Sequence, residues 1–143
     1  MSHTVYVPGS APNLQPLLAA VPRAVQASAQ DGELSLEREC IVATGGSARG
    51  VALSLAANDE GDTATAVRLF TCSSREDVAL AIDLVAALMA LGEGHALNED
   101  GEPFASPEEL REHYGPDFVA SYVGGRARSS RGRQNRTTER PSR

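Results

Sequence analysis

Two alternating segments separated by an acidic loop constrain the fold of this 143-residue chain more than any other feature. In residues 51–55 and 65–69, large or β-branched side chains alternate with small or polar ones, as in a strand with one buried face. The loop between them, residues 58–62, reads Asn-Asp-Glu-Gly-Asp and is typical of a turn. We therefore predict an antiparallel hairpin whose register pairs Leu55 with Thr65, Leu53 with Val67, and Val51 with Leu69.

This register places the apolar residues of both arms on one face of the hairpin. The other face would carry Arg68, Phe70 and Cys72 beside the small residues Ala52 and Ser54. A shift of one residue would turn one apolar set toward the opposite face. The apolar face therefore needs a cover, and the opposite face is expected to stay partly open.

Residues 33–42 have the same period of two. Leu34, Leu36, Cys40 and Val42 share one parity, and acidic or polar residues occupy most of the other. Arg38 is the exception, because it falls on the apolar parity. A buried arginine is costly unless it is paired. We expect Arg38 either to pair with a carboxylate of the body or to mark a sheet face left open for an acidic ligand, and it is a candidate binding residue.

The clearest helix follows Ser74, which is a typical N-cap, and runs to Leu91 before Gly92. Its apolar stripe is wide enough to pack across a sheet. A second helix begins after Ser106-Pro107 and ends near Tyr114. For residues 13–29 we expect one and a half helices, broken at Pro22.

These elements, with short strands at residues 4–8 and 95–97, predict one α+β domain over residues 1–124. It would contain an antiparallel sheet of four or five strands with its helices packed on one face. Aromatic residues make up only 4% of the chain, so the core must be built from Ala, Val and Leu. Residues 125–143 contain no large apolar side chain, and we predict a disordered tail there.

The charge of the chain is divided between two regions of opposite sign. All 13 basic residues are arginines; seven lie in the last 18 residues with one acid, a net charge of +6, whereas the preceding body carries six arginines and 18 acids, a net charge of −12. Arginines in such a tail attract phosphates, so RNA or DNA is a candidate partner. The candidate phosphate-binding residues are Arg126, Arg128, Arg131, Arg133 and Arg136.

The glycine-rich segment 44–50, Thr-Gly-Gly-Ser-Ala-Arg-Gly, has two interpretations. Successive backbone amides beside an arginine can hold an anion. A phosphate-binding loop is normally followed by a helix, however, whereas here another strand follows at Val51. We therefore favour a connection between two strands.

Catalytic and metal-binding motifs are sparse. Of the three histidines, His3 lies at a terminus, His113 lies one helical turn after Glu109, and His95 has acidic neighbours in sequence. An enzyme using His95 or His113 is therefore one alternative. Cys40 and Cys72 have no metal-ligand spacing. We favour buried, reduced thiols over a disulfide between them. We expect no metal, no cofactor and no catalytic residue.

The order of the predicted elements resembles that of small bacterial accessory or immunity-type domains. This resemblance covers architecture only, and implies a role in binding another protein. Together with the anionic body, it suggests a non-catalytic protein-binding module with a basic protein partner. The N-terminus shows no secretory signal and no segment is apolar enough to cross a membrane. We therefore expect a cytoplasmic protein.

Overall fold

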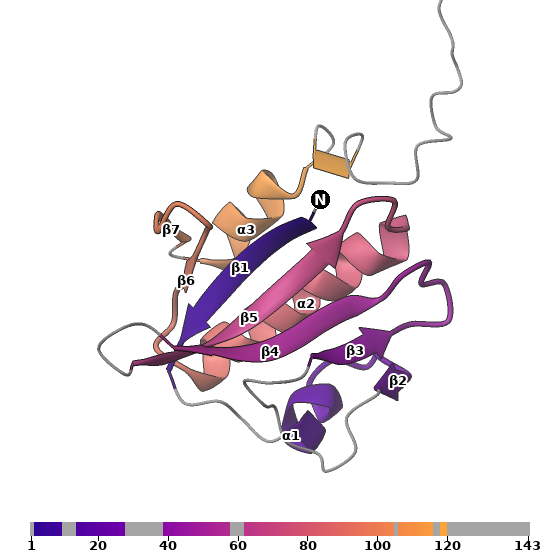
Figure 1. Cartoon of the computed structure of the whole chain (residues 1–143), viewed down its shortest axis with the longest axis horizontal. Helices are drawn as coiled ribbons and strands as arrows, with labels where there is room; N and C mark the ends of the chain where they lie inside the picture. The colour runs from indigo at the N-terminus through magenta and orange to yellow at the C-terminus, as the bar shows by residue number, and fades with distance from the viewer. Residues whose placement is uncertain are drawn as a thin grey trace, which may run out of the picture.

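The computed structural model describes residues 2–9, 14–27, 39–57, 62–104, 106–115 and 118–119. Within them, seven antiparallel strands form one sheet in the order β2-β3-β4-β5-β1-β6-β7, with three helices (Figure 1). The strands are β1 (Ser2–Pro8), β2 (Gln26–Ala27), β3 (Cys40–Ala43), β4 (Val51–Ala57), β5 (Thr63–Phe70), β6 (Ala96–Leu97) and β7 (Pro103–Phe104). The helices are α1 (Leu14–Ala19), α2 (Arg75–Leu91) and α3 (Pro107–His113).

The predicted α+β class and antiparallel sheet are confirmed. The sheet has more strands than the expected four or five because β2, β6 and β7 are two-residue strands at its edges. The register of the β4–β5 hairpin is also confirmed: Leu55 pairs with Thr65, Leu53 with Val67, and Val51 with Leu69. The sequence did not indicate that β1 pairs with the other edge of β5, where Val5 lies opposite Val67.

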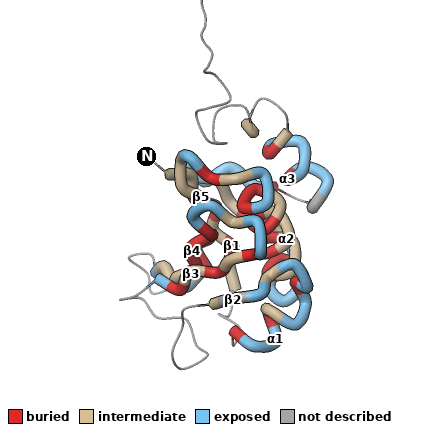
Figure 2. Tube along the Cα trace, turned by 90° about the vertical axis from the view of Figure 1, so that its right-hand side faces the viewer, coloured by how far each residue is buried: buried red, intermediate tan, exposed pale blue. Residues whose placement is uncertain are grey.

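Helix α2 covers the apolar face of the sheet, as predicted. Its N-cap Ser74 accepts a hydrogen bond from the backbone N–H of Asp77, and the Asp77 side chain accepts one from the Ser74 backbone in return. Helices α1 and α3 both pack against α2. Figure 2 shows that the buried positions concentrate where the central strands face α2. The core is aliphatic, with Leu53, Leu69, Leu80 and Leu84 fully enclosed.

Small side chains line the middle of the opposite face of the sheet. This face carries Ala52, Ser54 and Ala56 from β4 and Ala64 and Ala66 from β5. In the described part of the chain, most of these residues are only partly buried, because α2 lies on the other side. The expectation of a partly open face therefore agrees with the fold.

Two sequence expectations are wrong. The half helix expected after Pro22 does not form; the chain turns there and enters β2, where Ala27 pairs with Val42. Cys72 is not a buried strand residue. Strand β5 ends at Phe70, and Cys72 is exposed in a turn with φ of 62°, whereas Cys40 is buried as expected. Both are free cysteines.

Of the one and a half helices expected at residues 13–29, the structure describes α1. Residues 33–38, with Arg38, and the whole arginine-rich tail lie outside the described residues. The predictions made for them remain predictions. No helix in the described part of the chain has the length and hydropathy needed to span a bilayer.

Candidate functional site

The glycine-rich segment holds an anion, but the anion is the protein's own Asp77. One carboxylate oxygen of Asp77, Oδ2, accepts hydrogen bonds from the backbone N–H groups of Ala48 and Arg49, both at 3.0 Å, and of Ser74 at 3.1 Å. The other oxygen, Oδ1, accepts one from Gly50 at 3.2 Å. The connection between β3 and β4 is thus tied to the first turn of α2. These amides are not available for a phosphate.

The environment of Asp77 shifts its acidity. The side chain is fully buried, and burial alone would raise its pKa. Hydrogen bonds from the Ser47 side chain and from the backbone of Arg49, Ser74 and Ala48 outweigh that effect, so the pKa of Asp77 lies below its ordinary value. The ionised form is therefore the one that the fold requires.

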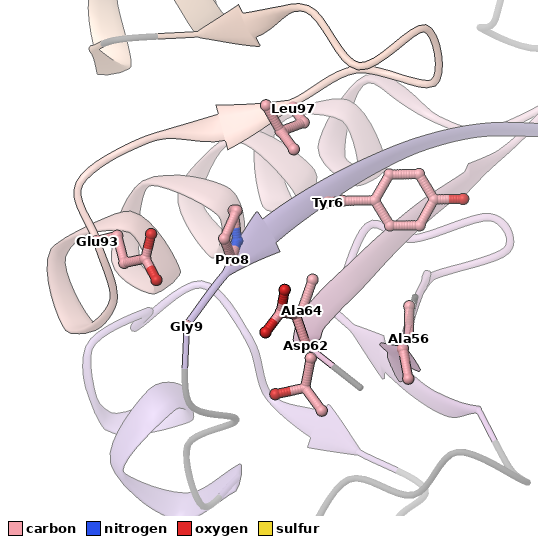
Figure 3. Close-up of a pocket in the computed structure, with 10 residues that line it drawn as sticks. Tyr6, Pro8, Gly9, Ala56, Asp62, Ala64, Glu93 and Leu97 are labelled. Carbon is pink, nitrogen blue, oxygen red and sulfur yellow. The ribbon is translucent and has the colours of Figure 1, made fainter. Parts of the chain in front are cut away.

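An open cavity lies at the other end of the central strands. Its volume is about 720 Å³, and it is bounded by the end of β1, the β4–β5 hairpin and the segment after α2. Figure 3 shows the Tyr6 ring and Leu97 in the lining, with the carboxylates of Asp62 and Glu93 on either side of the end of β1 in this view. The full lining is Tyr6, Pro8, Gly9, Ala56, Ala57, Asp62, Thr63, Ala64, Glu93 and Leu97.

The cavity combines apolar walls with negative charge. An aromatic ring, a leucine, a proline and three alanines provide apolar walls. The two charged residues of the lining, Asp62 and Glu93, are both acidic. Asp62 and Glu93 are exposed, so a ligand can reach both residues from solvent. An amphipathic cation, with an apolar stem and a charged end, matches this lining.

A separate cluster occupies the open sheet face further along β5. The guanidinium of Arg68 forms an ion pair with Glu39, with Nε of Arg68 2.7 Å from Oε2 of Glu39. The guanidinium groups of Arg68 and Arg49 also lie 4.5 Å and 4.8 Å from the centre of the Phe70 ring. Each of these cations therefore has a partner within the fold, which disfavours this cluster as an anion-binding site.

Two histidines that are far apart in sequence meet at the start of β1. Nε2 of His3 lies 3.1 Å from Nε2 of His113 on α3, and the hydroxyl of Tyr114 lies 3.3 Å from Nδ1 of His3. Phe118 and Phe104 pack against the same rings. Burial, followed by the charge of His113, lowers the pKa of His3 to about 4, and burial also lowers the pKa of His113.

The structure places His95 and His113, the two histidines singled out in the sequence, in different surroundings. His95 is partly buried beside β6, but it is absent from the lining of the cavity described above. His113 contacts His3, which lies 110 positions earlier in the sequence. Among the described residues, no group of three or more His, Cys, Asp or Glu side chains is placed to hold a metal ion.

Replacing Asp77 with asparagine should lower the free energy of unfolding by about 3 kcal/mol, because an amide nitrogen would then face backbone N–H donors. Urea denaturation of wild type, Asp77→Asn and the neighbouring control Glu76→Gln checks this. The control should change by less than about 1 kcal/mol, since its ion pair with Arg23 is exposed. An Asp77→Asn midpoint equal to that of wild type would contradict the assignment.

Because the pKa of Asp77 is lowered in the folded chain, its contribution to the free energy of unfolding depends on pH. This contribution is fully present above the pKa of an aspartate in the unfolded chain, about 3.9. It is lost as the pH falls through the lower pKa of the folded chain. The difference in free energy of unfolding between wild type and Asp77→Asn, measured by urea denaturation at several pH values, should therefore disappear only in this acidic range.

Titration of the imidazole protons by NMR in metal-free buffer should give His3 a midpoint of about 4 instead of 6.5. In His113→Gln the midpoint should rise but stay below 6.5, because burial is the larger cause. The unfolded chain takes up this proton at a higher pH than the folded chain, so acidification from pH 6.5 toward 4 should lower stability. An ordinary His3 midpoint would refute this geometry.

Comparison with known proteins assigns the chain to a family without assigning an activity. A family model described as a domain of unknown function, DUF4299, matches residues 19–127, which include all the elements from β2 to α3. His3 and the β1 wall of the cavity precede the matched region. No curated protein and no solved structure matches the sequence. Because the match covers most of its length, the chain belongs to the DUF4299 family.

Proposed function

We propose that this protein is a non-catalytic binding module whose acidic cavity receives a short basic segment of a protein partner. The cavity carries the proposal, because it brings Asp62 and Glu93 together with an apolar wall. The stems of arginine and lysine are apolar and their ends are charged. Such a side chain can lie along Tyr6 and Leu97 while its charged end reaches a carboxylate.

The charge of the described residues supports a cationic partner. They carry five arginines and 12 acidic residues, a formal net charge of −7. A negative surface accelerates association with a positive one and disfavours anionic partners. The specific contact would be made in the cavity, and the surrounding charge would mainly raise the association rate.

The size of the cavity suits part of a peptide. Its volume of about 720 Å³ lies within the range of about 300–1,000 Å³ that is usual for ligand sites. One arginine would leave much of this space open, so we propose that adjacent residues of the partner segment also enter. An accessory or immunity-type role in the cytoplasm is the concrete form of this proposal.

The alternatives have less support among the described residues. Neither His95 nor His113 lines the cavity, so an enzyme centred on them would lack a substrate site there. Nucleic-acid binding through the arginine-rich tail rests on composition, and residues Arg126 to Arg143 lie outside the described part of the chain. It remains a prediction from the sequence.

Binding can be measured by fluorescence anisotropy, with the full chain and a labelled seven-residue peptide that contains two arginines. The matched probe replaces both arginines with citrulline, which has nearly the same shape but no charge. We expect the arginine peptide to bind more tightly, and the double variant Asp62→Asn/Glu93→Gln to weaken its binding about tenfold. Added salt should also weaken the binding of the arginine peptide to wild type, since both carboxylates are exposed.

The control is the double variant Glu108→Gln/Glu112→Gln, which removes the same charge from α3, outside the cavity lining. It should bind the arginine peptide nearly as well as wild type. Equal weakening by both double variants would mean that only total charge matters. That result, or equal binding of the citrulline probe, would overturn the proposal.

A further inference from the structure

The contact between His3 and His113 brings together two ring nitrogens that can each act as a metal ligand. The two side chains come from β1 and α3, 110 positions apart in sequence, and they present the same ring atom, Nε2, to each other at 3.1 Å. The contact is exposed, so an ion can reach it from solvent. Neutral imidazole, through Nε2 or Nδ1, is the commonest side-chain ligand of metal ions in proteins.

The separation of the two nitrogens fits ligation of a single ion. Zn²⁺ binds imidazole nitrogen at about 2.0–2.1 Å. Two such ligands that subtend an angle between a right angle and the tetrahedral angle lie about 2.9–3.4 Å apart. The observed 3.1 Å falls inside that interval. A cation could therefore enter between the rings with little movement of either backbone.

The surroundings of His3 are compatible with the tautomer that ligation needs. A ligand nitrogen must present its lone pair, so the proton has to reside on the other ring nitrogen. The Tyr114 hydroxyl lies 3.3 Å from Nδ1 of His3 and can accept a hydrogen bond from an Nδ1–H group. Tyr114 is buried in the core, so this partner is held in place. Metal-binding histidines usually have such a partner on the second nitrogen.

We propose that His3 and His113 form a two-imidazole site for a borderline divalent cation such as Zn²⁺, Ni²⁺ or Cu²⁺. Because the described residues bring no third His, Cys, Asp or Glu to the pair, water would complete the coordination. Imidazole suits these ions, whereas Mg²⁺ and Ca²⁺ prefer oxygen ligands. The bound cation would link β1 to α3, and would stabilise the folded chain because the two ligands are distant in the unfolded one.

The test is calorimetric titration of Zn²⁺ into the untagged full chain, with thermal unfolding in the presence and absence of Zn²⁺ as a second readout. We expect one ion per chain, a higher midpoint of unfolding, and no effect of Mg²⁺. His3→Gln and His113→Gln should each weaken binding at least about tenfold and abolish the thermal shift. His95→Gln is the matched control and should bind as wild type does.

One further variant tests the role of Tyr114 in the site. Tyr114→Phe retains both ligands and most of the packing, and should weaken Zn²⁺ binding about tenfold through the lost partner on Nδ1. If His113→Gln binds Zn²⁺ as wild type does while His3→Gln does not, the ion is held at the chain's N-terminus and the proposal fails. It also fails if wild type shows no thermal shift, since the pair would then be only a hydrogen-bonded contact.

Discussion

The buried carboxylate of Asp77 is the constraint on which the arrangement of sheet and helix depends. It accepts hydrogen bonds from the backbone N–H groups of Ala48, Arg49 and Gly50 in one segment and of Ser74 in another. It thereby joins the start of β4 to the start of α2. Gly50 has φ of +76°, and a Cβ atom there would lie 2.8 Å from the carbonyl oxygen of Val42. The backbone therefore turns tightly into β4 while the carboxylate satisfies its donors.

This use of the glycine-rich segment shapes what the protein can bind. The amides that would attract an external anion are occupied at one end of β4, where Val51 begins the strand. The open cavity lies at the other end, where Ala56 and Ala57 contribute to its lining. The fold thus places the internally hydrogen-bonded amides and the open acidic cavity at opposite ends of β4, which supports the cationic ligand proposed above.

Local patterns in the sequence were sufficient for the elements and for one register. The hairpin pairing of Leu53 with Val67 follows from a period of two, and the start of α2 at Ser74 follows from capping chemistry. The candidate sites depend on contacts between distant segments. Asp77 resembles an ordinary acid in a first helical turn until the glycine-rich segment, 27–29 residues earlier, is placed against it. The pairing of His3 with His113 likewise needs the position of β1 beside β5, which no local signal indicates.

Amide hydrogen exchange of the native full chain, followed by NMR near neutral pH, tests the role of Asp77 most directly. The account predicts that the N–H groups of Ala48, Arg49 and Gly50 exchange as slowly as those in the centres of β4 and α2, although these three residues lie in a connection between strands. Exchange at the rate of an unstructured peptide would contradict it, because the amides would then be open to water and the carboxylate could not be holding them.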